Sequence, residues 1–182
     1  MNERVCPWWM AYTFDHPGRK LLHNTKKILG PYVKPGMTAM DVGCGMGFFS
    51  IAMAKLVGDE GAVVAVDLQQ KMLDVLMKRA RRAGVAHRIR THRCAQDHIG
   101  VDEPVDFILA CYVVHETPDQ KKFLEQVRVC LKPEAKFLII EPGWHVPKDN
   151  FARTLDTAKS VGLNLVAQPH LWVDRTALVE SS

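Results

Sequence analysis

The chain has 182 residues, of which 47% are hydrophobic and 24% charged, and its formal net charge is +4. This length suits one domain with a buried core, and the composition excludes disordered, collagen-like and membrane-embedded classes. No apolar run reaches the roughly 18 residues that cross a bilayer, and the first residues lack the charged-then-apolar order of a secretion signal. We therefore expect a cytoplasmic protein without a membrane partner.

Neither the cysteines nor the basic residues predict a special binding site. The five cysteines are odd in number, scattered and without a Cys-x-x-Cys pair, so we expect no disulfide framework and no metal site. Basic residues gather between positions 78 and 93, where they could meet phosphates. A solvated helix face followed by a polar edge strand explains them better, which argues against a nucleic-acid partner. The oligomeric state stays open.

Short β-rich runs alternate with longer runs of helical period, which predicts βαβ units and a parallel sheet. The expected strands are 37–42, 62–67, 88–94, 105–111 and 136–141. The expected helices are 48–56, 70–83, 117–131 and 150–161. The run 105–111 is almost wholly apolar, so we expect it at the centre of the sheet with both faces covered.

Local signals define several element ends. Gly58, Gly84 and Gly162 are suited to the left-handed position that ends a helix. The segment Thr117-Pro118-Asp119-Gln120 has the pattern of a capping box with proline at the first helical position, and Pro133 is expected to end that helix.

The last two β-rich runs, 163–167 and 171–179, are separated only by Gln168-Pro169-His170. So short a connection permits an antiparallel hairpin but not another parallel crossover. The predicted fold class is therefore a doubly wound α/β fold with a mostly parallel, seven-stranded sheet and a C-terminal antiparallel hairpin. We expect residues 1–32 to form an N-terminal arm that caps the binding site and residues 33–182 to form the ligand-binding domain.

The most specific motif is Asp41-Val42-Gly43-Cys44-Gly45-Met46-Gly47, which joins the first predicted strand to the helix that follows it. Glycines here allow a tight bend and bring bare main chain against a ligand. A dinucleotide site would place its third glycine at position 48, where this chain has the bulky Phe48. The observed spacing instead resembles motif I of the class I S-adenosylmethionine (SAM)-dependent methyltransferases.

The resemblance extends over 33–179 through three further segments in the family's order. Asp67 ends the second strand, where a carboxylate accepts hydrogen bonds from ribose hydroxyls, although this by itself suits NAD or SAM equally. Cys94-Ala95-Gln96-Asp97 has an acidic residue where the family binds the adenine amino group, with a surface carboxylate as the alternative. The run 105–116 resembles the family's fourth motif. The chain departs from the family at Glu134-Ala135, where many relatives have Gly-Gly in a turn far from the ligand.

The resemblance implies SAM as cofactor, with S-adenosylhomocysteine as its product. The residues that it implies for cofactor binding are Asp41, Gly43, Cys44, Gly45, Gly47, Phe48, Asp67, Leu68, Gln96, Asp97, Ala110, Cys111 and Tyr112. Aromatic faces favour a sulfonium, and Tyr112, Phe48, Trp8 and Trp9 are available.

Methyl transfer is an in-line displacement, and holding the acceptor aligned in a water-poor site supplies much of the rate. If the acceptor must lose a proton, His115 and Glu116 are the candidate general bases, because they follow the fourth strand. His115 could equally serve a local packing role. Glu141 and His145, after the fifth strand, are weaker candidates.

The segment around Trp8 and Trp9 is rich in large apolar side chains, and with His145 it is a candidate for a lid or substrate contact. An arm that simply packs on the domain is the alternative. The acceptor is expected to be a small molecule, since no large basic platform for nucleic acid is apparent, and RNA or protein acceptors stay open as alternatives. Two other functions stay open: a SAM-binding protein without transferase activity, and an NAD(P)-dependent reductase. Phe48 and the lack of a Tyr-x-x-x-Lys pair oppose the reductase.

Overall fold

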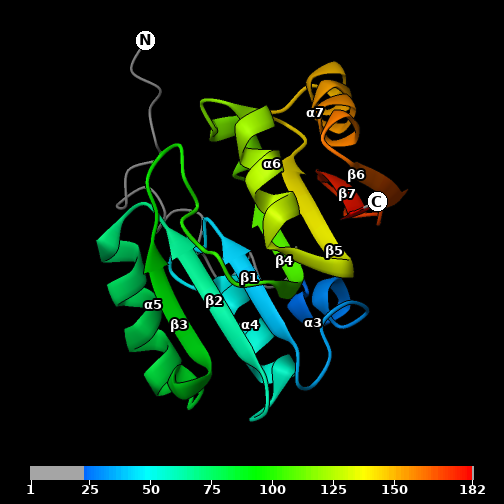
Figure 1. The fold of residues 1–182 in the computed structure, drawn as a ribbon. Helices are drawn as coiled ribbons and strands as arrows, with labels where there is room; N and C mark the ends of the chain where they lie inside the picture. Colours follow the sequence, from blue (N-terminus) through cyan, green and yellow to red (C-terminus); the bar gives the residue numbers. More distant parts are fainter. Residues whose placement is uncertain (1–22, 182) are drawn as a thin grey trace.

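The β-rich runs of the sequence form one seven-stranded sheet in the order β3-β2-β1-β4-β5-β7-β6 (Figure 1). The computed structural model of the protein describes residues 23–181. Its strands are β1 (Thr38–Val42), β2 (Ala62–Asp67), β3 (Ile89–Arg93), β4 (Val105–Cys111), β5 (Leu131–Pro142), β6 (Leu163–Ala167) and β7 (Asp174–Ser181). Its helices are α3 (Thr25–Leu29), α4 (Phe48–Val57), α5 (Gln70–Arg82), α6 (Gln120–Cys130) and α7 (Lys148–Ser160), with short 3-10 turns η1 (Ala86–Arg88) and η2 (Val114–Glu116).

The predicted fold class is confirmed. Strands β1 to β5 pair in parallel, whereas β7 pairs antiparallel with both β5 and β6. The apolar run of β4 lies in the middle of the seven strands, as its composition predicts, because both faces of a central strand are covered by helices.

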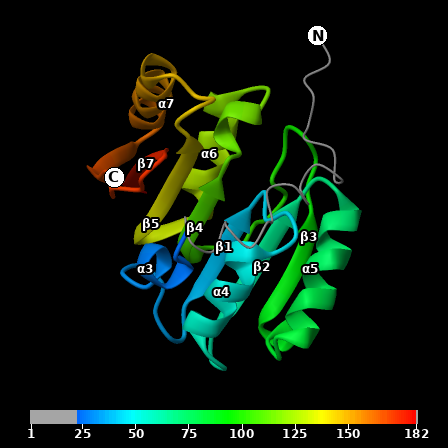
Figure 2. The ribbon, with the colours of Figure 1, turned by 180° about the vertical axis from the view of Figure 1, so that it is seen from behind.

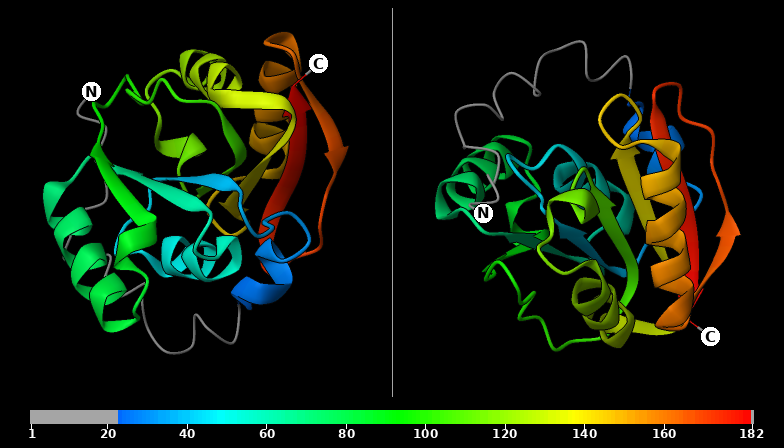
Figure 3. Two further views of the ribbon diagram at one scale, coloured as in Figure 1. Left: turned by 60° about the horizontal axis from the view of Figure 1, so that its bottom comes forward. Right: turned by 90° about the horizontal axis from the view of Figure 1, so that it is seen from above.

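Two hydrophobic cores fill the space between the sheet and its two helical layers. Helices α3, α4 and α5 cover one face, where Leu29, Met53 and Leu76 are fully buried. Helices α6 and α7 lie on the other side of the sheet (Figure 2). Leu124 of α6 and Phe151 of α7 are buried there. Helix α7 lies against β6 and β7 at one end of the sheet (Figure 3). This three-layer arrangement leaves the carboxyl ends of the parallel strands available for a ligand.

Two local predictions about α6 are wrong. The helix begins at Gln120, and its N-cap is Asp119, whose side chain accepts the backbone N–H of Lys122. Thr117 instead donates its hydroxyl to the Val114 carbonyl, so the capping box does not form. The helix ends at Cys130 before Pro133, because β5 already begins at Leu131 and pairs with Val105 of β4.

The C-terminal hairpin forms as predicted, but its connection is longer than the sequence suggests. Strand β7 begins at Asp174, and Leu171 packs against the α3–α5 core. Of the predicted N-terminal arm, residues 1–22 lie outside the described part. The described remainder contains α3, whose Ile28 and Leu29 are buried in the core with α4, so this helix is part of the domain. Within 23–181, no helix has the length and apolar character to cross a membrane.

Candidate functional site

A cavity of about 920 Å³ opens at the carboxyl ends of the parallel strands. After β1 the chain builds β2 and β3 on one side and then returns to place β4 on the other side. Such a reversal of strand order leaves a crevice where ligands bind in open α/β sheets. The volume falls in the range of small-molecule sites. The loops after β1, β2, β3, β4 and β5 all contribute to the wall.

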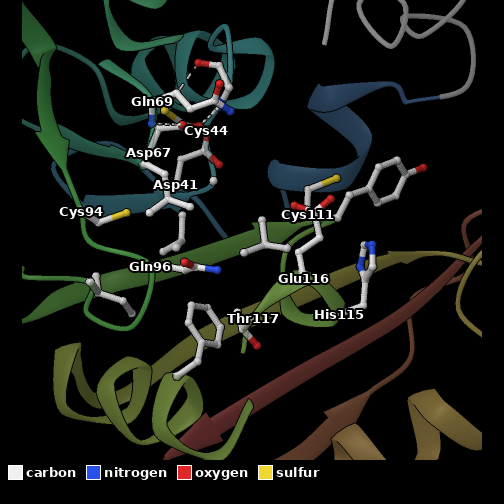
Figure 4. Close-up of a pocket in the computed structure, with 18 of the residues that line it drawn as sticks. Asp41, Cys44, Asp67, Gln69, Cys94, Gln96, Cys111, His115, Glu116 and Thr117 are labelled. Carbon is white, nitrogen blue, oxygen red and sulfur yellow. Dashed lines mark hydrogen bonds between the residues drawn. The ribbon is translucent and has the colours of Figure 1, made fainter. Parts of the chain in front are cut away.

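The labelled side chains of the cavity fall into separate sets in Figure 4. Asp41, Cys44 and Asp67 come from the ends of β1 and β2 and the loops that follow them, whereas Cys111, His115 and Glu116 come from the end of β4 and the segment after it. These six predicted residues thus line one cavity, although they come from segments far apart in the sequence.

The three glycines of the first loop all have positive φ, but they differ in what a Cβ at each position would meet. A Cβ on Gly43 would lie 2.3 Å from a Val113 methyl, and one on Gly47 would lie 2.6 Å from Leu76 Cγ. Gly45 has a φ of 51° and lines the cavity, and no atom of residues 23–181 lies within 4 Å of its missing Cβ. Gly45 is therefore the position where bare backbone is available to a ligand.

Gly47 and Ala110 are predicted cofactor residues that do not line the cavity. Gly47 is buried at the start of α4, where it allows close packing on Leu76 of α5. Ala110 is fully buried within β4. The sequence motif therefore includes one glycine that packs against a neighbouring helix and does not line the cavity.

Asp67 is held in place by the backbone of two loops. One carboxylate oxygen accepts the Gly45 N–H and the other accepts the Gln69 N–H, each at 2.9 Å. Burial raises the pKa of Asp67, and the two backbone hydrogen bonds oppose this shift. Each oxygen retains a second lone pair, so the carboxylate can also accept hydrogen bonds from a ligand.

Asp41 and Cys44 of the glycine motif are both buried. The buried Asp41 carboxylate accepts the Ser50 hydroxyl at 2.5 Å, which ties the end of β1 to α4. Burial, with the charges of Asp41 and Asp67, raises the pKa of Cys44 well above its ordinary value, so the thiol stays neutral.

The wall between β2 and β3 combines apolar and polar groups. Leu68 and Met72 line it beside Gln96 and Asp97. The exposed Asp97 carboxylate accepts the Lys122 ammonium at 2.9 Å, and this hydrogen bond lowers the pKa of Asp97. A flat heterocycle could lie on the apolar side chains and donate to this carboxylate.

Tyr112, the first residue after β4, has a φ of 64°, which is rare for a residue with a side chain. Its hydroxyl donates to Asp174 at 2.6 Å, and its ring packs edge-on against Trp144 at a centroid distance of 5.6 Å. The other Asp174 oxygen bonds His23 Nε2 at 2.7 Å. These contacts keep an aromatic wall at the open end of the central strand.

His115 is held by Glu141 at two points. The carboxylate bonds the imidazole Nδ1 and also accepts the His115 backbone N–H at 3.3 Å. Burial alone would lower the pKa of His115, but the hydrogen bond and charge of Glu141, with the charge of Glu116, outweigh it and raise the pKa. Removal from water raises the pKa of Glu116, helped by Glu141 and opposed by His115 and His145.

The remaining predicted residues have mixed outcomes. Phe48, Cys111 and His145 line the cavity, and the His145 ring lies 5.2 Å from that of His115. Trp8 and Trp9 lie outside the described residues.

Sequence reasoning missed Trp144 on the cavity wall and Asp174 behind Tyr112, since neither belongs to a recognisable motif. Within residues 23–181, no group of three His, Cys, Asp or Glu side chains could hold a metal ion.

Known proteins resemble this chain in both sequence and fold. A model of the methyltransferase domain family matches residues 33–175. The demethylmenaquinone methyltransferase of Lactobacillus johnsonii is 34% identical over 110 residues, which are 60% of this chain and 45% of that protein. The chain spans about half the length of the curated relatives it matches.

Two solved structures share the fold at low sequence identity. A SAM-dependent methyltransferase from Aquifex aeolicus superposes with a TM-score of 0.88 at 23% identity, over 98% of this chain and all of that one. Aeropyrum pernix fibrillarin with natively bound SAM superposes with a TM-score of 0.68 at 17% identity, over 81% of this chain and 68% of that one. Since the family model covers most of the sequence, the chain belongs to the class I family of SAM-dependent methyltransferases.

Proposed function

We propose that this protein transfers a methyl group from SAM to a small-molecule acceptor. The observation that carries the proposal is the pairing of Gly45 with Asp67. The open Cβ position of Gly45 leaves main chain bare on the cavity wall, and its N–H fixes the Asp67 carboxylate beside it. This arrangement suits an adenosyl amino acid, whose ribose hydroxyls donate to a carboxylate and whose remaining atoms need close approach to backbone.

Residues of this chain would hold the cofactor at three places. Asp67 would accept the ribose hydroxyls, and Gln96 and Asp97 would meet the adenine beside Leu68. The methionine part would be surrounded by residues from two segments, which are Asp41, Gly43, Cys44 and Gly45 from the first and Cys111 and Tyr112 from the second. When bound, SAM supplies an electrophilic methyl group on a positively charged sulfur. The faces of Tyr112 and Phe48 favour such a charge.

The acceptor would enter between the loops that follow β4 and β5. His115, Glu116, Trp144 and His145 line this part of the cavity. The aromatic side chains would position a planar acceptor, and the chain would contribute rate mainly by alignment and exclusion of water. Relatives named demethylmenaquinone methyltransferases make demethylmenaquinone the first acceptor to test.

The proposal is tested by calorimetric titration of the full chain with SAM, S-adenosylhomocysteine and NADH, followed by an acceptor screen with methyl-labelled SAM. We expect both adenosyl ligands to bind and NADH not to bind. NADH binding without a response to either adenosyl ligand would favour the reductase and overturn the proposal. Binding of SAM with no label transferred to any acceptor would favour a SAM-binding protein without transferase activity.

Two expectations from the sequence belong to the same proposal. The first is a cytoplasmic location. The second is that the arm with Trp8 and Trp9 closes over the cavity. Deletion of residues 1–16 tests the second point, because a lid would be needed for full SAM affinity and activity. Unchanged affinity and activity would count against the lid.

A further inference from the structure

The buried Glu141 carboxylate is directed at one residue of the cavity wall. Glu141 lies near the end of β5, and 2% of its side-chain surface is exposed, against 18% for His115. It contacts both the imidazole Nδ1 and the backbone N–H of His115. A carboxylate removed from water is costly unless it is paired, so this pairing defines the place of the imidazole.

The contact also assigns the two ring nitrogens. An ionised carboxylate only accepts hydrogen bonds, so Nδ1 carries the proton and Nε2 has the lone pair of the neutral ring. In the described part of the chain, no side chain or backbone group hydrogen-bonds Nε2, and His115 lines the main cavity. Nε2 is therefore the atom able to take a proton from a bound molecule.

The other charged groups around His115 do not compete for Glu141. Arg175 lies opposite Glu141 in the β5–β7 register, yet its guanidinium donates to the carbonyls of Val146 and Gly143, at 2.6 and 3.3 Å. Among residues 23–181, Glu116 and His145 are further titratable neighbours, and His145 contacts the ring edge-on. The negative charge of Glu141 thus favours an imidazolium at His115.

His115 and His145 also border a second, smaller cavity of about 190 Å³. Its wall includes Glu141, Gln120, Asn150 and the buried Thr154. The His115 side chain therefore borders both the main cavity and this smaller polar cavity.

From this geometry we infer that Glu141 is a positioning residue that makes His115 the general base of the reaction, and that the acceptor carries a phenolic or enolic hydroxyl. The inference rests on the proposed methyltransferase function. The acceptor hydroxyl gives its proton to Nε2 of His115, and the acceptor electron pair forms the new bond to the methyl carbon. The carbon–sulfur bond breaks, and its electron pair returns to sulfur.

The first test measures the imidazole without any turnover. The carbon-bound ring protons of His115 are titrated by NMR in the protein saturated with S-adenosylhomocysteine, and the His115→Gln spectrum identifies them among the eight histidines. We expect Glu141→Gln to lower the pKa of His115 by about 1 pH unit or more, because an opposite charge at contact distance is removed. Glu141→Asp should restore part of the shift, since it keeps the charge on a shorter side chain.

A matched control is Glu103→Gln, which breaks a surface ion pair with Arg90 and should leave the His115 titration unchanged. Calorimetry with SAM accompanies each variant. If SAM does not bind to the unsubstituted chain, the proposed function fails. If SAM binds and His115 titrates identically in the unsubstituted protein and in Glu141→Gln, only the present inference fails.

The second test compares acceptors that do and do not lose a proton. A panel of phenols and matched tertiary aromatic amines is assayed with labelled SAM. We expect methylation of phenols, a loss of about 10²- to 10⁴-fold in kcat for His115→Gln with little change in KM, and a shift of the acidic limb of the pH profile to lower pH in Glu141→Gln. Turnover of the amines alone, or phenol turnover that is insensitive to His115→Gln, would overturn the inference.

Discussion

The Tyr112 hydroxyl donates a hydrogen bond of 2.6 Å to the Asp174 carboxylate, 62 residues further along the chain. This bond joins the loop after β4 to the first residue of β7. Glu141 makes a similar connection from the end of β5 to His115. Two buried carboxylates from the antiparallel end of the sheet thus hold the segment that borders the acceptor region.

Loss of the Tyr112 hydroxyl should destabilise the fold. In Tyr112→Phe, Asp174 loses this donor and keeps its bond to His23, and we expect a decrease of about 1.5–3 kcal/mol in the free energy of unfolding, as for a hydrogen bond to a charged group. Urea denaturation measures it. Tyr32→Phe is the control, because the Tyr32 ring stacks on Phe107 and no hydrogen bond to its hydroxyl is seen within residues 23–181. Equal effects of the two substitutions would contradict the assigned role of Asp174.

Asp67→Asn should reduce both SAM affinity and stability. Asparagine has one acceptor oxygen, so either the Gly45 N–H or the Gln69 N–H loses its acceptor, and the ribose hydroxyls lose a charged acceptor. We expect about a 10- to 100-fold weaker Kd by calorimetry, which corresponds to about 1.4–2.8 kcal/mol. Asp156→Asn, on the exposed side of α7, is the control and should bind SAM as the unsubstituted protein does. An unchanged Kd in Asp67→Asn would exclude this carboxylate from the cofactor site.

Gly45→Ala separates backbone strain from ligand exclusion. Among the described residues the new Cβ meets no atom within 4 Å, but it lies at the cavity wall and forces alanine to a φ of 51°. We expect about 1 kcal/mol of destabilisation from the backbone and a large loss of SAM affinity from the methyl group. Gly84→Ala imposes a similar strain at a φ of 71°, away from the cavity, and should destabilise without changing affinity. If both variants bind SAM equally well, Gly45 does not lie against the ligand.

Glu134→Gly should stabilise the protein. Glu134 has a φ of 63° and is exposed, so a side chain in the left-handed region costs about 1 kcal/mol there, and glycine removes that cost. We expect a higher Tm by thermal denaturation. Glu134→Ala keeps the unfavourable φ and should show no such gain. A lower Tm for the glycine variant would mean that the Glu134 side chain makes a stabilising contact.

The contribution of the His115–Glu141 pair to stability should fall as pH rises. The pKa of His115 is raised in the folded state, so the stabilisation is fully present below the unfolded value of about 6.5 and is lost as pH rises through the folded value. The difference in unfolding free energy between the unsubstituted protein and Glu141→Gln should be larger at about pH 5.5 than at about pH 9. Denaturant titrations at both pH values measure it. A difference that grows with pH would show that the pKa of His115 is not raised in the folded state.

Periodicity and motif spacing in the sequence determined the elements of the fold. The bounds of β2 and β4 agree with the predicted runs 62–67 and 105–111, because a strand covered on both faces needs an unbroken set of apolar side chains. The glycine loop predicted the place of the ligand crevice, because glycines at the end of β1 let a ligand approach the backbone closely. The sequence also predicted that His115 follows the central strand.

Tertiary structure decided which neighbours each of these residues contacts. Gly43 and Gly47 occupy the same motif as Gly45, yet a Cβ on either would meet a side chain, Val113 or Leu76, from another part of the chain. A capping-box pattern predicts the start of α6, but the Thr117 hydroxyl donates to the Val114 carbonyl and Asp119 caps the helix instead. The partners of Tyr112 and His115 come from β7 and β5, because long-range pairing is set by strand order in the sheet and no local spacing encodes it.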